Sequence, residues 1–284
     1  TILKDIGMLF SLKTGIYSPK NYKNNFYGPI LYRYALANSR NIPATQLAAE
    51  LGLNKLAQYY INFGIAQNLK DLEQAGIGAA IGAYTISLEQ LIKVYGIFAN
   101  DGNNYNISFF PQIDDALQIY TDKKRKVIDS NIARIITDYL SDPLARLPTF
   151  NRLGNLEYPF AFAAKTGTSN NFKDALAAGY SKKFVCAVWL GNKNFNSMNQ
   201  LTGENSAAFI LNKILNILHY NDLYKLEKDE FEKPENHRKY NICKLSGKLA
   251  TSDCLYISEE WLPKNEKIEK CNIHKTYKLD KRFN

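Results

Sequence analysis

The chain has 284 residues, of which 45% are hydrophobic, and its formal net charge is +9 at pH 7. This length and this apolar share predict one substantial folded core with a smaller appendage. Lysine and arginine are scattered and form no arginine-rich helix or aromatic–basic segment, so nucleic acid is not an expected partner. A basic surface suits an anionic polymer or membrane surface, and a general bias toward Lys, Asn and Tyr explains the charge equally well. No apolar run reaches about 18 residues, so neither a transmembrane helix nor a signal peptide is expected within the chain.

The first half of the chain predicts extended segments followed by helices. Residues 1–35 are rich in Tyr, Asn and Pro and predict loop and extended structure. Helical patterns then cover residues 45–51, 53–64 and 87–100. The last of these helices has Ser87 as its N-cap and ends at an Asn-Asp-Gly stop. Residues 109–127 predict a β-hairpin-type excursion.

The second half changes from helix to sheet. Residues 129–141 predict a helix whose apolar face carries Ile132, Ile135, Ile136 and Leu140. Apolar runs separated by turn-like gaps predict three strands, at residues 160–168, 174–180 and 184–191. An amphipathic helix over 206–220 follows. This order predicts the α/β (α+β) class, with an antiparallel sheet, a helical subdomain and a covering helix. A charged linker over 221–239 would separate a domain at 1–220 from the start of a small C-terminal domain at 240–284.

The tetrapeptide Lys165-Thr166-Gly167-Thr168 lies within the first predicted strand. The lysine brings a fixed positive charge to a carboxylate-bearing ligand, and Thr166 brings a hydroxyl to the same anion. Gly167 has no Cβ, so an acyl ligand can lie close to the strand edge. Lys-Thr-Gly on a strand is a signature of penicillin-binding proteins and serine β-lactamases. On its own, a solvated turn is the commoner explanation of so short a string.

A second candidate element, Ser39-Arg40-Asn41, lies upstream and has the form Ser-x-Asn. The hydroxyl of Ser39 and the amide of Asn41 would face the lysine strand across a cleft, where they would hold a proton-transfer network and a substrate amide. The plainer interpretation is that Asn38 and Ser39 cap a helix and that Pro43 sits in its first turn.

Longer stretches of the chain favour a functional role for Ser39 and Lys165, because all of them resemble the same protein family. The run Tyr-Ser-Pro-Lys-Asn-Tyr at 17–22 and the run Phe-Tyr-Gly-Pro-Ile at 26–30 approach the Ser-x-Asn element. Further runs that match the same family pattern occupy residues 82–91, 95–102, 140–146 and 189–192. The chain resembles the penicillin-binding transpeptidase domain of class A, bifunctional peptidoglycan synthases, and most of all their 1C branch. The resemblance spans nearly the whole chain and implies the β-lactamase/transpeptidase-like fold, N-terminally truncated and followed by a small cysteine-containing extension.

This resemblance implies a serine D,D-transpeptidase that cross-links peptidoglycan by acyl transfer and needs no cofactor. Ser39 and Asn41 would support the proton network, Lys165 and Thr166 would bind the substrate carboxylate, and the N–H of Thr168 would form half of an oxyanion hole. The family's nucleophile is the serine of Ser-x-x-Lys, and no serine in the chain has lysine three positions later. The chain is therefore expected to start downstream of its nucleophile and to be inactive alone.

The resemblance also implies partners and a compartment. The expected partners are the peptidoglycan stem peptide and, once a nucleophile is supplied, β-lactam antibiotics. The expected location is the periplasmic side of the inner membrane, with membrane attachment only through an upstream segment. Arg40 stands where the 1C branch usually has leucine. Residues 171–176 and 192–198 also differ from the pattern of that branch, so details of the substrate groove stay open. A non-catalytic remnant that binds wall peptide or partner proteins is the alternative function, and a β-lactamase is less favoured.

The C-terminal tail contains Cys243, Cys254, Cys271 and His274. Three thiolates and one imidazole could supply four zinc ligands, although the close Cys-x2-Cys pairs of strong zinc motifs are absent. An extracytoplasmic compartment favours a disulfide between two of the three cysteines, with one left over. Unliganded thiols are the second preference, and a zinc site is the last. The disulfide is the preferred prediction, and Cys186, in an apolar strand, is expected in the core.

Overall fold

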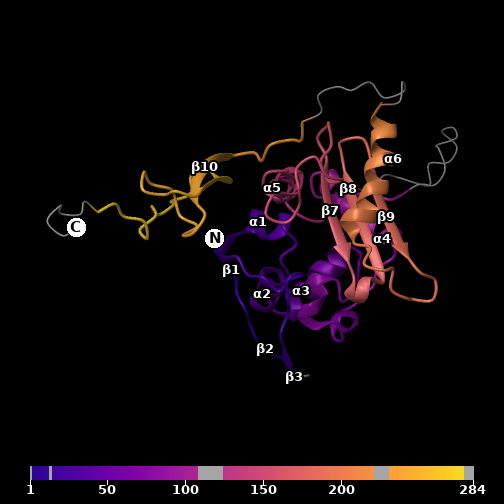
Figure 1. Cartoon of the computed structure of the whole chain (residues 1–284). Helices are drawn as coiled ribbons and strands as arrows, with labels where there is room; N and C mark the ends of the chain where they lie inside the picture. Colours follow the sequence, from indigo (N-terminus) through magenta and orange to yellow (C-terminus); the bar gives the residue numbers. More distant parts are fainter. Residues whose placement is uncertain (1, 13–14, 108–123, 221–229, 278–284) are drawn as a thin grey trace.

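A three-stranded antiparallel sheet forms the centre of the computed structural model, which describes residues 2–12, 15–107, 124–220 and 230–277 (Figure 1). Its strands are β7 (Ala163–Thr168), β8 (Asp174–Tyr180) and β9 (Val185–Gly191), in the spatial order β7-β8-β9. Each of the three predicted strands is present, and β7 begins three residues later than predicted. The predicted mixed fold class is confirmed.

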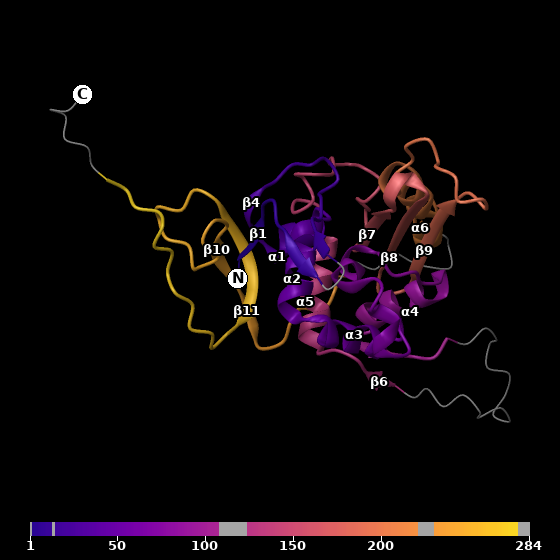
Figure 2. The same ribbon diagram turned by 90° about the horizontal axis from the view of Figure 1, so that it is seen from below.

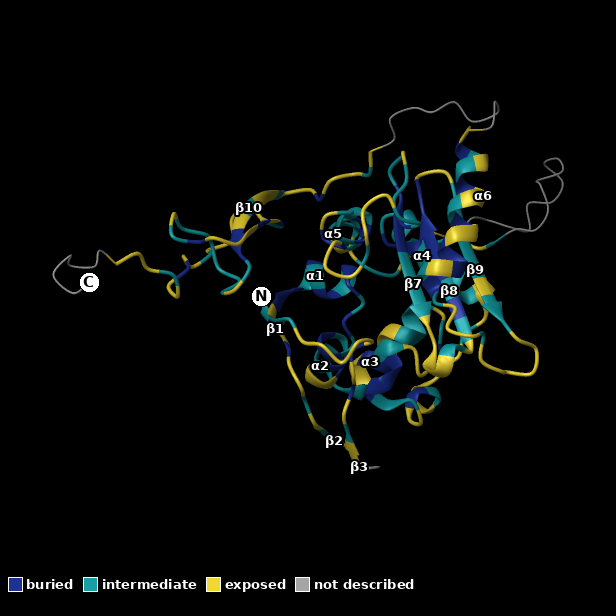
Figure 3. Ribbon diagram, viewed as in Figure 1, coloured by how far each residue is buried: buried dark blue, intermediate teal, exposed yellow. Residues whose placement is uncertain are grey.

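The two faces of this sheet pack against different helices because successive strand residues point to opposite sides. On one face, Ala164 and Ala177 pack with Leu211 of the covering helix. On the other face, Ala163 and Tyr180 pack with the neighbouring helices of the body. Figure 2 shows the sheet between these two helical layers, and Figure 3 shows buried residues along β8 and at the start of β7. The helices involved are α4 (Leu88–Ala99), α5 (Ser130–Ser141) and α6 (Ala208–Tyr220).

Local sequence signals set the starts of two of these helices. Ser87 Oγ accepts a hydrogen bond from Gln90 N at 3.1 Å, and the Gln90 side chain accepts one from Ser87 N at 2.9 Å, which forms a capping box. Asp129 caps α5 by accepting from Asn131 N at 2.9 Å. The predicted starts of α4 and α5 are therefore right to within one residue. Helix α6 starts later than predicted, because a π-helical turn occupies Gly203–Ala207.

The helical subdomain contains two α-helices and two 3-10 turns. It lies below the sheet in Figure 1. Helix α2 (Asn41–Leu51) begins four residues earlier than predicted, with Pro43 in its first turn, where a missing N–H costs no hydrogen bond. Helix α1, just before it, begins inside the stretch predicted as extended and ends two residues beyond it. Such a short helix depends on burial, and three of its six residues are buried. The remaining bounds are α1 (Tyr32–Ala37), α3 (Leu53–Asn62) and the turns Leu69–Leu72 and Gly76–Ile81.

Short antiparallel pairs complete the body of the molecule. Strand β1 (Ile2–Asp5) pairs with β4 (Gly28–Leu31), and β2 (Phe10–Leu12) pairs with β3 (Gly15–Tyr17). A two-residue ladder joins β5 (Asn103–Asn104) to β6 (Arg125–Lys126). This ladder lies at the base of the predicted excursion, most of which falls outside the described residues.

The C-terminal extension is built on a hairpin of β10 (His237–Cys243) and β11 (Ile257–Pro263). Neither strand is predicted from the sequence, and β10 begins inside the stretch predicted as a linker. The hairpin docks on the body beside α1 (Figure 2). Arg33 of α1 pairs with Glu260 of β11 at 3.0 Å and with Asp138 of α5 at 2.6 Å. The side chains of Arg33 and Glu260 are only 5% and 8% exposed, so this ion pair is buried at the contact.

Candidate active site

Ser39 occupies the tight link between α1 and α2. Its φ of +52° is a left-handed conformation that non-glycine residues adopt infrequently. Backbone hydrogen bonds hold the link, since Ser39 N donates to Leu36 O at 3.1 Å and Arg40 N donates to Ala35 O at 3.0 Å. The Nζ of Lys165 donates a hydrogen bond to Ser39 Oγ. The predicted proximity of these two side chains, 126 residues apart in sequence, is confirmed.

The Lys165 ammonium has an unusual environment. Besides Ser39, its Nζ donates to the backbone oxygen of Thr166 at 2.8 Å. Burial, with a smaller contribution from the positive charge of Arg146, lowers the pKa of Lys165 from 10.5 to about 8. An amine with this pKa is mostly protonated at neutral pH but gives up its proton readily. Lys165 is therefore suited both to attract an anion and to exchange a proton with Ser39.

Arg146 contacts β7 at the edge that β8 does not pair. Its buried guanidinium donates to Leu156 O at 2.7 Å, to Ala164 O at 3.1 Å and to Leu140 O. Burial lowers the pKa of Arg146, and carbonyl oxygens are its hydrogen-bond partners among the described residues. This residue was missed as a site component. The only signal in the sequence was its place at the end of the family-like run at 140–146.

Strand β7 presents an edge with backbone groups that β8 does not pair. Ala164 O and Thr166 O accept hydrogen bonds from Arg146 and Lys165, so these carbonyls point away from β8. Because backbone directions alternate along a strand, the N–H of Thr168 points to the same edge. An extended peptide could therefore add to β7 as a further strand.

The other residues of the tetrapeptide take different positions. Thr166 follows Lys165 directly, so its side chain points to the opposite face of the sheet. Thr168 Oγ1 accepts a hydrogen bond from Gly203 N at 3.0 Å. A Cβ on Gly167 would meet the Leu176 side chain at an ordinary 3.5 Å, so packing within the chain does not require glycine there. The predicted close approach of a ligand at Gly167 stays a prediction.

Asn41 is the first residue of α2, and its amide is engaged away from Lys165. Its backbone N donates to Asn21 Oδ1 at 3.0 Å, and its Nδ2 donates to Lys20 O at 2.8 Å. These bonds tie the start of α2 to the Tyr-Ser-Pro-Lys-Asn-Tyr run. The predicted contact of Asn41 with a substrate stays a prediction.

Arg40, the departure from the family pattern, points into the body. Its Nε donates to Asp5 Oδ2 at 2.7 Å, and its guanidinium lies 3.9 Å from the centroid of the Tyr27 ring. Asp5 is fully buried and also accepts from Asn21 Nδ2 at 2.7 Å. Arg40 therefore anchors the Ser39 link to β1. Asp5 and Asn21 were not predicted, because nothing in the sequence places β1 beside this link.

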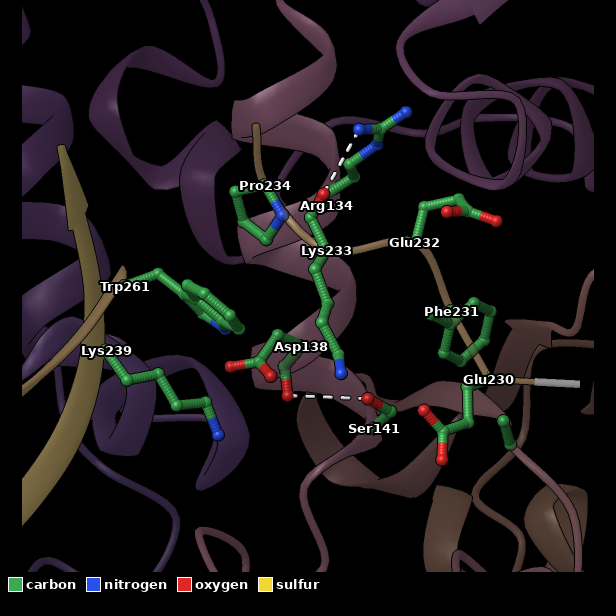
Figure 4. A pocket seen from close by; sticks show the side chains of 11 residues that line it. Arg134, Asp138, Ser141, Glu230, Phe231, Glu232, Lys233, Pro234, Lys239 and Trp261 are labelled. Atoms are coloured by element: carbon green, nitrogen blue, oxygen red, sulfur yellow. Dashed lines mark hydrogen bonds between the residues drawn. The ribbon is translucent and has the colours of Figure 1, made fainter. Parts of the chain in front are cut away.

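A pocket of about 430 Å³ lies elsewhere, where the segment leading into the extension crosses α5 (Figure 4). Phe231, Lys233 and Trp261 line it together with Asp138, and Arg134 donates to Lys233 O at 3.1 Å. Its lining contains no residue of the Ser39–Lys165 pair. The pocket belongs to the junction between body and extension rather than to the candidate active site.

The four donor residues of the tail lie together in the structure. The ligand atoms of Cys243, Cys254, Cys271 and His274 are all within 4.8 Å of one another. No two of the chain's four cysteines are joined in a disulfide. Within the described ranges, no helix combines the length and apolar character that crossing a membrane requires.

Ser39 and the partly buried Lys165 meet beside the edge of β7 that β8 does not pair. A sequence model of the penicillin binding protein transpeptidase domain matches residues 9–216. The chain belongs to this family. The predicted family is thereby confirmed.

Relatives of the 1A, 1B and 1C kinds match, so the class A assignment holds without favouring the 1C branch. Penicillin-binding protein 1A of Clostridium tetani is 28% identical over 88% of this chain and 33% of its own length. Penicillin-binding protein 1C of Escherichia coli is 30% identical over 72% of this chain and 25% of its own length. The chain thus spans about a third or less of the length of these relatives.

Solved structures show the same fold. Penicillin-binding protein 1A from Haemophilus influenzae matches 93% of this chain and 44% of its own, with a TM-score of 0.75 and 18% identity. PonA1 from Mycobacterium tuberculosis, solved in complex with penicillin V, matches 82% of this chain and 66% of its own, with a TM-score of 0.63 and 19% identity.

Proposed function

We propose that these residues form the carboxylate-binding and proton-relay side of a D,D-transpeptidase site that cross-links peptidoglycan stem peptides. The observation that carries the proposal is the hydrogen bond from Lys165 to Ser39 at the open edge of β7. This contact puts a cation and a hydroxyl beside the edge of β7 that β8 does not pair. Such a site would act on the extracytoplasmic side of the membrane, where the stem peptide is found.

Each group has a distinct task in this proposal. The terminal carboxylate of the stem peptide binds the Lys165 ammonium, and the peptide backbone lies along β7. The N–H of Thr168 donates to the carbonyl oxygen as negative charge develops on it. Asn41 would need to turn from Lys20 O to reach the substrate amide.

The proposed reaction has two acyl transfers. A serine oxygen bonds to the carbonyl carbon of the penultimate D-alanine, and the bond to the terminal D-alanine nitrogen breaks. The proton lost by that serine reaches the leaving nitrogen through Ser39 and Lys165. The amine of a second stem peptide then attacks the ester carbonyl carbon, the bond from that carbon to the serine oxygen breaks, and a proton from the amine returns to the serine oxygen.

The attacking serine is not among these 284 residues, because none of their serines has the partner lysine of Ser-x-x-Lys. We therefore propose that the active site is completed by a serine outside them.

Labelling with a fluorescent penicillin tests this proposal. The 284-residue chain should stay unlabelled, whereas a longer chain that includes an upstream in-frame Ser-x-x-Lys should be labelled covalently. Lys165→Ala in the longer chain should abolish the label, and Lys193→Ala, at an exposed lysine, should leave it unchanged.

Two outcomes would contradict the proposal. Labelling of the 284-residue chain at a mapped serine would show that the nucleophile lies within it. A longer, folded chain with Ser-x-x-Lys that takes no label would favour a non-catalytic protein that binds wall peptide.

A further inference from the structure

Four donor atoms converge in the C-terminal extension, and none of them belongs to the Ser39–Lys165 site. The Nδ1 of His274 lies 3.5 Å from Cys243 Sγ, 3.5 Å from Cys254 Sγ and 3.2 Å from Cys271 Sγ. All three cysteines are buried, with 0%, 7% and 7% of their surfaces exposed. One imidazole nitrogen therefore faces three sulfurs at once.

These distances match the edges of a tetrahedron around a single ion. With metal–sulfur bonds of about 2.3 Å and a metal–nitrogen bond of about 2.0–2.1 Å, tetrahedral angles place each sulfur about 3.6 Å from the nitrogen. The three observed distances lie within a few tenths of an ångström of that value. The limit of 4.8 Å on every separation in the group leaves room for one ion at its centre and no larger cluster.

The backbone brings these residues together from three separate segments. Cys243 ends β10, and its N donates to Lys248 O at 2.8 Å. Cys254 lies in the loop between the hairpin strands. Cys271 N donates to Leu249 O at 2.8 Å, which attaches the final segment to that loop and places His274 beside the sulfurs. The convergence therefore depends on hydrogen-bonded backbone and not only on side-chain rotamers.

The extension has little else at its centre. The buried cluster consists of the three cysteines, with Ala250 packed against it. Large apolar side chains around it are exposed instead, among them Leu255, Ile273 and Tyr277. A domain segment this small needs a cross-link or a metal when it lacks an apolar core.

A disulfide fits this arrangement less well than a metal does. A single disulfide would use two of the sulfurs and leave the third thiol and the imidazole buried beside it. A metal ion uses all four donors, and three thiolates with one imidazole are a ligand set that selects zinc. A metal site therefore replaces the disulfide preferred from the sequence. That preference rested on the compartment, whereas the structure shows that His274 contacts all three sulfurs.

We propose that Cys243, Cys254, Cys271 and His274 bind one Zn²⁺ in a closed tetrahedral site. Four protein ligands leave no open position, so the ion is structural and not catalytic. It fastens the final segment to the β10–β11 hairpin, whose Glu260 carries the contact with Arg33 of the body. The zinc site does not depend on the transpeptidase proposal.

Metal analysis of the 284-residue chain, prepared without a histidine tag and exported to an oxidising periplasm, tests the zinc site. Elemental mass spectrometry should find one zinc per chain after gel filtration. Co²⁺ in place of Zn²⁺ should give the intense visible d–d bands of tetrahedral cobalt and the near-ultraviolet charge-transfer band of cobalt–thiolate bonds.

Matched variants assign the ligands. Cys254→Ser and His274→Asn should lose most of the zinc and the cobalt–thiolate band. Cys186→Ser and His237→Asn should keep both, because these residues lie outside the cluster. Hydrogen exchange of the β8 amides, unchanged in all four variants, would show that the body stays folded.

Three results would overturn the zinc site. The first is a chain without zinc that also takes up no Co²⁺ when loaded. The second is a mass lower by two hydrogens, with a peptide that links two of the three tail cysteines. The third is zinc that survives both ligand substitutions.

Discussion

Replacing Arg40 by leucine, the residue usual in the 1C branch, should destabilise this chain even though it restores the family pattern. Arg40 and Asp5 form an ion pair with side-chain exposures of 6% and 0%. Removal of one partner from a buried pair costs about 3–5 kcal/mol, because the other charge is left without compensation. Asp5 keeps hydrogen bonds from Asn21 Nδ2 at 2.7 Å and Tyr27 N at 3.0 Å, so we expect about 3 kcal/mol.

Urea unfolding followed by far-ultraviolet circular dichroism measures this loss. The double variant Arg40→Leu/Asp5→Asn should lose about 1–3 kcal/mol less unfolding free energy than the two single variants lose together, because the two residues are in contact. The control is Arg152→Leu, which breaks the pair between the exposed Arg152 and Glu157 at the protein surface and should cost no more than about 1 kcal/mol. An Arg40→Leu chain as stable as the Arg152→Leu chain would refute the anchoring role.

Two further predictions concern the cation of the site and the docking of the extension. Since the pKa of Lys165 is lowered to about 8, its ammonium is present below that pH and lost above it, so binding of a carboxylate ligand should weaken as pH rises through about 8. The opposite sign holds for stability: the unfolded chain binds the extra proton between about pH 8 and 10.5, so the folded state should gain stability across that window. NMR titration of the lysine side chain checks the pKa, and a midpoint near 10.5 would contradict the environment described for Lys165. Arg33→Met should speed hydrogen exchange in β10 and β11 while leaving β8 protected, because it removes the buried partner of Glu260; equal protection in both chains would show that other contacts hold the extension.

Repeated local patterns explain why much of the sheet and helix content was predictable. The apolar runs of β7, β8 and β9 are separated by polar turns, and Ser87 and Asp129 place their side chains as caps within the next turn of chain. These features depend on neighbours a few residues away. Helix α1 and strands β10 and β11 were missed, because their short or polar sequences are ordered by long-range contacts such as that of Arg33 with Glu260.

Some residues of the candidate site were likewise predictable from the sequence, and others were not. Lys165 and Ser39 were found because a family resemblance links two distant strings that no periodicity connects. Arg146 and Asp5 were not found, since a buried arginine that meets backbone carbonyls leaves no partner pattern in the sequence. The tail cysteines were visible from the start, but the choice between disulfide and metal needed the distances to His274.

Binding of an acetylated Lys-D-Ala-D-Ala peptide to the ¹⁵N-labelled 284-residue chain tests the central claim most directly. At pH 7 the amides of Ser39, Lys165 and Thr168 should shift together, with a dissociation constant on the order of millimolar because no covalent step is available. Lys165→Ala should remove these shifts, and Lys193→Ala should preserve them. Shifts that persist unchanged in the Lys165→Ala chain, or that fall away from β7 and the Ser39 link, would contradict a carboxylate-binding site at this sheet edge.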